Sequence, residues 1–456
     1  MKSHWTNSAI FYHIYPLGLC GAPRRNDFSA GPVARLEQLY PWLDHIQSLG
    51  ANALYLGPLF ESTAHGYDTA DYYQVDRRLG TNETLAALAR ELHRRGLRLV
   101  LDGVFNHVGR DFWAFRDVQA NGQGSAYAGW FKGLDFGKRS PYGDAFAYDG
   151  WSGNFDLVRL DGDHPDVRRH LLDAVTQWTE QFGIDGLRLD AADQLSDGFL
   201  EALGAHCRGL RSDFWLMGEI VFGDYRRLLG PGRCDSVTNY EAYKGLYSSL
   251  NDHNYFEIAY ALKRQFGEQG IYRGFGLYNF ADNHDVDRVA SRLKDAAHLY
   301  PLYALLFSMP GIPSVYYGSE WGLPGARTPH SDAALRPALD LARAAQPAPQ
   351  PDLPAALRKL AAVRGASPAL QRGDYHELYV SAGQLAFERA LPGERVIVAL
   401  NASPEPIAID MPIPEPDARL VDLLNPGEEF ALRNGKARVE IPPTWGRIMR
   451  MLNDEC

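Results

Sequence analysis

Short apolar runs alternate along the chain with longer stretches in which apolar residues recur every three or four positions. The short runs predict buried strands, and the longer period predicts amphipathic helices. The eight predicted strands are residues 10–15, 53–57, 98–104, 186–190, 215–219, 236–240, 276–280 and 314–317. The clearest helical patterns between them are residues 33–49, 84–95, 165–182 and 301–308. This alternation favours a closed (β/α)8 TIM barrel, an α/β fold, over an open doubly wound sheet.

Two stretches interrupt the alternation. Residues 109–160 are rich in Gly, Asp, Tyr and Trp with little periodicity, so we expect an irregular excursion after strand 3 that overhangs one face of the barrel. Residues 374–456 contain alternating segments broken by Pro and Gly, which predict a C-terminal antiparallel β-sandwich domain. The barrel itself is then expected to comprise residues 1–108 and 161–373.

Composition excludes several classes of protein. The 456 residues carry a net charge of −10 without a basic run, so neither nucleic acid nor an anionic membrane is an expected partner. The longest apolar stretch is much shorter than the ~20 residues that span a bilayer, and the polar N-terminus is unlike a signal peptide. Four scattered cysteines without metal-type spacing suit a reducing compartment, so we expect a cytoplasmic protein. The oligomeric state is left open.

Acidic residues follow several of the predicted strands. They are Asp102, Asp190, Glu219 and Asp285, at or just after strands three, four, five and seven. Barrel enzymes carry their chemistry at the C-terminal ends of strands, so these side chains are the first candidates for a site. A role as a helix N-cap would account for one such Asp, but it does not account for all of these acidic residues together.

These carboxylates suit the cleavage of a glycosidic bond, which needs a proton donor and a second carboxylate that meets the oxocarbenium-like sugar. On adjacent strands, Asp190 and Glu219 can approach the roughly 5 to 5.5 Å separation of a retaining mechanism. Arg188 lies two residues before Asp190 and so points to the same side of its strand, where it would keep Asp190 ionised. An apolar setting and a nearby anion would instead keep Glu219 protonated.

The carboxylates stand in four ordered motifs that resemble those of the α-amylase family of glycoside hydrolases. The motifs are Asp102-Gly-Val-Phe-Asn-His107, Gly186-Leu-Arg-Leu-Asp-Ala191, Gly218-Glu219 and Phe280-Ala-Asp-Asn-His-Asp285. The resemblance extends over about residues 8 to 322. It implies a catalytic barrel, an excursion after strand three and a C-terminal β-sandwich.

The resemblance also implies a role for each site residue. Asp190 would be the nucleophile, Glu219 the acid/base, and Asp285 the third carboxylate, which holds sugar hydroxyls as the ring distorts. Asp102 would be structural. The residues expected to bind substrate are Tyr67, Asp68, His107, Arg188, His284 and Arg288.

Within the family, the stretches at residues 66–72 and 235–240 are similar to those of cyclomaltodextrinases and neopullulanases, which process maltodextrins. We expect an α-glucan oligosaccharide as substrate, because Asp193-Gln194 stands where many starch-cleaving members have a Lys-His pair. Because the first predicted strand begins at residue 10, we expect no counterpart of the extra N-terminal domain that is usual in that group. A transglycosylase or isomerase with the same covalent intermediate is the main alternative, and a non-catalytic family member is a weaker one.

The resemblance offers little support for a metal. Asn106 matches a calcium ligand of the family, but the usual second ligand is missing and hard cations require several oxygen atoms. We therefore expect no obligatory cofactor, with Ca²⁺ at Asn106 as the alternative.

Overall fold

The computed structural model describes residues 4–345, 348–414 and 417–453. Its centre is a sheet of eight parallel strands in the order β11-β10-β9-β5-β2-β1-β13-β12. A parallel bridge between Thr238 and Tyr278 joins the two edges and closes the barrel. The strands are β1 (Phe11–Ile14), β2 (Ala53–Leu56), β5 (Arg98–Gly103), β9 (Gly186–Leu189), β10 (Trp215–Gly218), β11 (Ser236–Val237), β12 (Tyr278–Phe280) and β13 (Ile312–Tyr316). The predicted barrel is confirmed.

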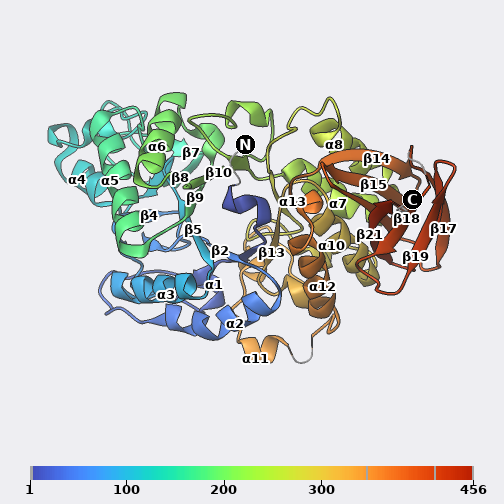
Figure 1. Ribbon diagram of the computed structural model, residues 1–456. Coiled ribbons are helices and arrows are strands. Elements are labelled where there is room, and N and C mark those ends of the chain that lie inside the picture. The colour runs from blue at the N-terminus through green and yellow to red at the C-terminus, as the bar shows by residue number, and fades with distance from the viewer. Residues whose placement is uncertain (1–3, 346–347, 415–416, 454–456) are drawn as a thin grey trace.

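Helices surround the barrel (Figure 1); those up to α10 lie between its strands in the chain, and α11 to α13 follow its last strand. They are α1 (Pro16–Leu19), α2 (Tyr40–Ser48), α3 (Asn82–Arg94), α5 (Pro165–Phe182), α6 (Asp197–Leu210), α7 (Tyr240–Asn251), α8 (Phe256–Phe266), α9 (Val289–Arg292), α10 (Leu299–Ser308), α11 (Leu341–Ala344), α12 (Leu353–Gly365) and α13 (Pro368–Arg372). None of the helices in the described part of the chain is long and apolar enough to cross a membrane.

Local sequence signals explain where these helices begin and end. Helix α5 starts with Pro165, whose fixed φ suits the first helical position, and ends before Gly183, which adopts a left-handed φ of 64°. The predicted helix at residues 33–49 is divided instead into a 3-10 turn, Arg35–Leu39, and α2. Pro41 lies in the first turn of α2 and lacks the N–H that a continuous helix would need there.

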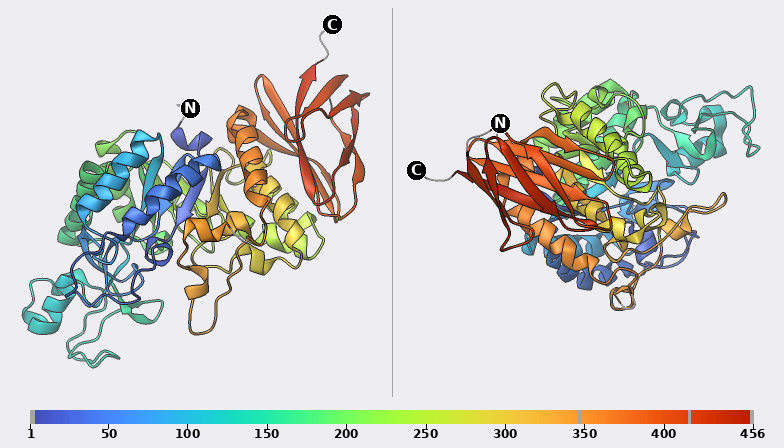
Figure 2. Two further views of the ribbon diagram at one scale, coloured as in Figure 1. Left: turned by 90° about the horizontal axis from the view of Figure 1, so that it is seen from below. Right: turned by 90° about the vertical axis from the view of Figure 1, so that its right-hand side faces the viewer.

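Residues that follow β5 form the excursion, which lies at the end of the molecule away from the C-terminal domain (Figures 1 and 2). A three-stranded antiparallel sheet joins it to the barrel, with strands β6 (His107–Gly109), β7 (Gly150–Trp151) and β8 (Asn154–Arg159). Helix α4 (Trp113–Asn121) lies beyond this sheet. The rings of Trp113 and Trp130 pack against His170 of α5, at 5.6 and 5.5 Å between centroids. A further hairpin of β3 (Phe60–Ser62) and β4 (Thr69–Val75) follows β2.

The C-terminal domain is an antiparallel sheet in the order β14-β15-β16-β21-β18-β19-β20-β17. Its strands are β14 (Asp374–Val380), β15 (Gln384–Leu391), β16 (Glu394–Asn401), β17 (Ile407–Pro412), β18 (Ala418–Asp422), β19 (Glu429–Arg433), β20 (Lys436–Ile441) and β21 (Trp445–Asn453). The pairing is continuous, and β14 also packs beside β17, so the sheet folds over a core of its own that includes Ile397, Leu420 and Met449. The predicted antiparallel β domain is therefore confirmed.

Candidate active site

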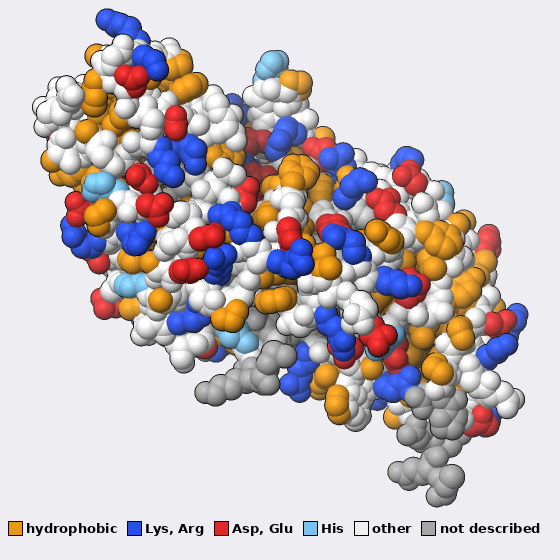
Figure 3. Space-filling model, turned by 90° about the horizontal axis from the view of Figure 1, so that it is seen from above, with side chains coloured by type: hydrophobic (Ala, Val, Ile, Leu, Met, Phe, Trp, Pro, Cys, Tyr) orange, Lys and Arg blue, Asp and Glu red, His pale blue; other side chains and the backbone are white. Residues whose placement is uncertain are grey.

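The C-terminal ends of the barrel strands open into a cleft with a volume of about 700 Å³. Asp190, Glu219 and Asp285 line it, together with Tyr67 and His107. Figure 3 shows the molecule hollowed at its upper edge, beside the lobe that the excursion forms, with acidic side chains inside the hollow. The cleft therefore contains all three strand-end carboxylates that the sequence nominated for catalysis.

A buried guanidinium joins two of these carboxylates. Arg188 is 3% exposed, and its Nη1 lies 2.8 Å from Oδ1 of Asp190 while its Nη2 lies 2.7 Å from Oε1 of Glu219. Nη1 also lies 3.0 Å from Oδ1 of Asp102, whose Oδ2 accepts hydrogen bonds from Tyr55 and Tyr67. Asp102 thus supports the site from below, in agreement with a structural role.

The pairing of β9 with β10 brings the two carboxylates together. The strands are parallel with Leu189 opposite Gly218, so Asp190 and Glu219 leave them at the same level. A Cβ on Gly218 would lie 3.1 to 3.3 Å from Ala192, Cys234 and Leu228, which explains the need for glycine in this tightly packed position.

Backbone strain follows directly after Asp190. Ala191 has a left-handed φ of 43°, which L-residues other than Gly adopt at a cost of about 1–2 kcal/mol. In this conformation its N–H donates to Oε2 of Glu219 at 3.1 Å. The strained residue therefore helps to fix the position of the Glu219 carboxyl group.

Asp285 lies between two basic side chains. Its Oδ2 is 2.9 Å from Nε2 of His284, and its Oδ1 is 2.9 Å from Nη2 of Arg336. Arg336 also pairs with Asp332 at 2.8 Å. The N-cap alternative for Asp285 is not what the structure shows, because Asp282 instead accepts the hydrogen bond from Val289 at the start of α9.

Burial and neighbouring charges shift the pKa values of the three carboxyl groups in different directions. Burial raises the pKa of both Asp190 and Glu219, and the positive charge of Arg188 opposes that rise in each. Burial also acts to raise the pKa of Asp285, but His284 and Arg336 outweigh it and hold that pKa well below its usual value. One guanidinium therefore faces a coupled pair of buried carboxyl groups, while Asp285 stays ionised.

His107 and Tyr67 flank the carboxylates in the cleft. Burial lowers the pKa of His107 to about 3, so the imidazole is neutral at physiological pH. Its Nε2 lies 3.8 Å from Asp190 and has no hydrogen-bond partner among the described residues. The ring of Tyr67 stacks on that of His284, 5.5 Å between centroids, and its hydroxyl donates to Asp102 at 2.9 Å.

Four residues expected to bind substrate lie outside the lining of the cleft, namely Asp68, Arg188, His284 and Arg288. Arg188 contacts the carboxylates, and His284 contacts Asp285 and Tyr67. Asp68 is 5% exposed and accepts hydrogen bonds from the backbone of His65 and Gly66, so its carboxylate holds that loop.

Arg288 is fully buried, and its guanidinium donates to the carbonyls of Tyr317 and Leu335. This placement corrects the expectation of a substrate contact, because the side chain turns inward at the start of α9 instead of toward the cleft.

Other cleft residues were not nominated from the sequence. The rim after Glu219 carries Val221 and Phe222, which are 41% and 86% exposed, and the excursion contributes Trp151. Tyr240 and Asn154 line the cleft as well, and Tyr240 belongs to the stretch at residues 235–240 that the family resemblance had singled out. Arg327, Asp332 and Arg336 come from the loop after β13, where the sequence shows no motif that marks them.

The side chain of Asn106 is engaged within the protein. Its side-chain Nδ2 lies 3.1 Å from Nδ1 of His107, and its backbone carbonyl accepts a hydrogen bond from the N–H of Leu160 at the end of the excursion. Across residues 4–345, 348–414 and 417–453, three or more His, Cys, Asp or Glu residues are nowhere grouped so as to hold a metal ion. The expectation of a metal-independent enzyme stays a prediction.

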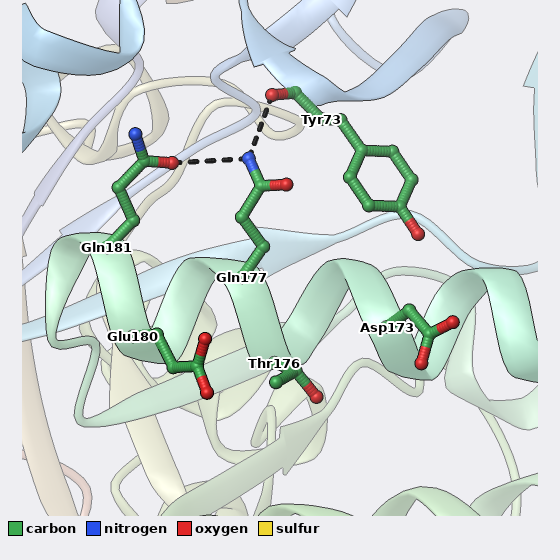
Figure 4. A pocket seen from close by; sticks show the side chains of 6 residues that line it. All are labelled: Tyr73, Asp173, Thr176, Gln177, Glu180 and Gln181. Atoms are coloured by element: carbon green, nitrogen blue, oxygen red, sulfur yellow. Dashed lines mark hydrogen bonds between the residues drawn. The ribbon is translucent and has the colours of Figure 1, made fainter.

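A second hollow lies along α5, beside Tyr73 of β4 (Figure 4). Its lining consists of Tyr73, Asp173, Thr176, Gln177, Glu180 and Gln181. Gln177 donates to the carbonyl of Tyr73 and to Gln181, as the dashed lines show. Nothing here combines paired carboxylates with a buried cation, so the strand-end cleft is the candidate active site.

Comparison with known proteins assigns the family. Residues 34–346 match the model described as alpha amylase, catalytic domain. The chain belongs to the α-amylase family of glycoside hydrolases. This confirms the resemblance read from the sequence motifs and the assignment as an enzyme.

Similar proteins cover almost the whole chain. It is 30% identical to a cyclomaltodextrinase from Geobacillus thermopakistaniensis, over 96% of this chain and 76% of the relative. It is also 30% identical to neopullulanase 2 of Thermoactinomyces vulgaris, over 98% of this chain and 78% of the relative. Among solved structures, the cyclic alpha-maltosyl-(1→6)-maltose hydrolase of Arthrobacter globiformis, in complex with that sugar, superposes with a TM-score of 0.83 at 30% identity, over 98% and 99% of the chains.

Proposed function

We propose that this family member is a retaining α-glycosidase that hydrolyses α-glucosidic bonds in maltooligosaccharides or related α-glucans. The observation that carries the proposal is the single guanidinium of Arg188, which holds Asp190 and Glu219 together at the ends of adjacent strands. A shared cation within one hydrogen bond of each carboxylate keeps them close, as a retaining mechanism with about 5–5.5 Å between the groups requires.

In the first step, Glu219 donates its proton to the glycosidic oxygen while Asp190 attacks the anomeric carbon. The bond to the leaving sugar breaks, and a covalent glycosyl-enzyme forms. Burial of the coupled pair favours one retained proton, and the chemistry assigns this proton to Glu219.

In the second step, Glu219 removes a proton from water, which attacks the anomeric carbon and releases Asp190. Asp285 holds hydroxyls of the bound sugar in both steps, because His284 and Arg336 keep it ionised and oriented. His107 stays neutral, so its unpartnered Nε2 is available to the same sugar. None of these steps requires a metal, and we expect activity to persist after dialysis against EDTA.

The substrate class rests on the relatives and on the cleft. The relatives are named for cyclomaltodextrin and pullulan hydrolysis, and the similar solved structure holds a cyclic maltosyl-maltose. The cleft of about 700 Å³ combines paired carboxylates with the rings of Tyr67, Trp151 and Phe222, which suit the polar edges and apolar faces of sugars. Incubation with maltotriose, cyclodextrin, pullulan, isomaltose, trehalose and sucrose, with chromatography of the products, tests the class and separates hydrolysis from glucosyl transfer.

Replacement of Glu219 by Gln tests the acid directly. We expect cleavage of maltotriose to fall by about 10²-fold or more, while the first step on an activated aryl α-glucoside is largely spared, because a good leaving group needs little protonation. Burst kinetics with the aryl substrate measure that step. Equal losses on both substrates, at an unchanged melting temperature, would remove Glu219 from the acid role.

A further inference from the structure

Another pocket, separate from the cleft and from the hollow along α5, lies where the barrel meets the C-terminal domain. Its volume is about 450 Å³, and it is lined by residues 273–276, 310–311 and 371–375, together with Asn7 and the end of β15. Residues 276 and 310–311 precede β12 and β13, so the pocket lies at the N-terminal ends of the barrel strands. It is therefore at the opposite end of the barrel from the catalytic cleft.

The lining of this pocket is positively charged. Arg273, Arg372 and Arg389 line it, and Asp374 is the acidic residue among the described lining residues. Asp374 is already paired with Arg273, at 2.9 and 3.2 Å. The excess of positive charge is local, because the chain as a whole has a net charge of −10.

The burial of Arg389 makes this excess charge unusual. Its side chain is 1% exposed, and its guanidinium donates to the carbonyls of Gly373 and Ser308, at 2.7 to 3.2 Å. Carbonyl groups satisfy donors but carry no full negative charge, and no described carboxylate forms an ion pair with this guanidinium. Asp374 acts on it electrostatically from beyond ion-pair distance and is already paired with Arg273, and a buried charge that is only partly compensated is costly.

A second buried arginine lies behind the first. Arg364 is 1% exposed and donates to the carbonyls of Phe307, Leu370 and Gly311, while its Nε has no partner among the described residues. Burial lowers the pKa of each guanidinium to about 9, and Arg364 also lowers that of Arg389. The hydroxyl of Tyr375, another lining residue, is buried and likewise unpartnered.

We propose that this pocket binds a small anion that carries a phosphoryl group. Planar guanidinium groups match phosphate oxygens in geometry as well as charge, and an anion here would add to the partial compensation that Asp374 gives the buried Arg389. The Tyr375 hydroxyl can donate to the same oxygens. Because Arg273 precedes β12 and Arg389 belongs to β15, a bound anion would also connect the barrel to the C-terminal domain.

A purely structural role for these arginines explains less. Their hydrogen bonds to carbonyls at the end of α10 and just before β13 do fix that corner of the fold. The same bonds do not account for the cavity, the exposed Arg372 or the unpartnered Tyr375 hydroxyl. The structural role predicts that phosphate does not bind here at all.

Calorimetric titration of the full chain with inorganic phosphate and with glucose 1-phosphate, at constant ionic strength, tests the proposal. We expect saturable binding of at least one of them, and no binding of glucose or chloride. Equal affinities indicate a phosphate-sized occupant, and tighter binding of glucose 1-phosphate indicates a sugar phosphate. The Arg273→Gln/Arg372→Gln variant should bind at least about tenfold more weakly, and Asp374→Asn should bind more tightly.

Arg169→Gln provides the matched control, because Arg169 is also an exposed arginine in an ion pair, with Asp166 at 2.6 Å on α5. Its phosphate affinity should equal that of the unmodified protein. The proposal is overturned if neither ligand binds, or if the lining variants and the control bind phosphate equally. The melting temperature of each variant without phosphate identifies any that misfold. If the double variant misfolds, the charge-conserving Arg372→Lys replaces it and should retain part of the phosphate affinity.

Discussion

At the scale of single residues, the contacts of Asp285 favour a catalytic role for this strand-end carboxylate over a structural one. It lines the cleft with two basic partners, whereas the side chain that accepts a hydrogen bond from the first N–H of α9 is that of Asp282. Asp285→Asn keeps the size of the side chain and removes its charge. We predict a fall in kcat of about 10²-fold or more, roughly 2.7 kcal/mol, with a much smaller change in KM, because hydroxyl contacts strengthen in the transition state.

Asp287→Asn is the control for this measurement. Asp287 lies two residues away, pairs with Arg292 at 3.4 Å and is outside the cleft lining. Its kcat should stay close to that of the unmodified enzyme. A near-normal kcat for Asp285→Asn on an α-glucan would contradict the role proposed for Asp285.

His107 links the site to the pH dependence of stability. The folded protein keeps this imidazole neutral down to about pH 3, whereas an unfolded chain protonates it near pH 6.5. The unfolded state therefore binds more protons between these values, and the free energy of unfolding falls as the pH falls below 6.5. Relative to His107→Gln, the unmodified protein should lose roughly 2 kcal/mol of stability between pH 7 and pH 5. Urea unfolding at both pH values measures this, and parallel losses in the two proteins would contradict it.

The residues of the site differ in how far sequence predicts them. Asp190 and Glu219 are predictable because each directly follows an apolar strand, and Asp285 because it ends the family motif that begins at Phe280, the last residue of β12. Arg336 and Asp332 are not, because they lie in a long irregular loop whose path depends on tertiary packing. Burial is also invisible in the sequence, so Arg288 was expected to contact the substrate although its side chain turns inward.

At the scale of the elements, the strands follow from their apolar runs, since buried parallel strands have no polar face. Most of their ends differ by a residue or two from the predictions, which is the usual uncertainty of such boundaries, and β11 ends three residues before the predicted residue 240. The strands of the C-terminal domain were less completely predicted from the sequence than those of the barrel. The charged residues of β15 are the buried Glu388 and Arg389, and those of β19 are exposed, so neither strand reads as an uninterrupted apolar run.

The turn after β9 gives an element-level prediction. Ala191→Gly should be nearly neutral for stability, because relief of a left-handed φ, about 1 kcal/mol or more, offsets the greater backbone freedom of glycine in the unfolded chain. Ala87→Gly, in the middle of α3, should cost about 1 kcal/mol because no strain is relieved there. Urea denaturation of the two variants measures the difference. Equal destabilisation would show that Ala191 is not strained.

At the scale of the whole molecule, the barrel places its catalytic cleft and its arginine-lined pocket at opposite ends of the strands. The first was predictable, because strand-end motifs mark it. The second was not, because its residues come from the barrel, α13 and β15 and meet only when the C-terminal domain docks. The cytoplasmic location expected from the sequence stays a prediction.

The anomeric form of the first product tests the central claim most directly. If Asp190 forms a covalent intermediate, water attacks from the face that the leaving sugar vacated, and the configuration is retained. Proton NMR of maltotriose or cyclodextrin hydrolysis, recorded before mutarotation, should show the newly released reducing end as the α-anomer. An initial excess of the β-anomer would mean direct attack by water and would contradict the assignment of Asp190 as the nucleophile.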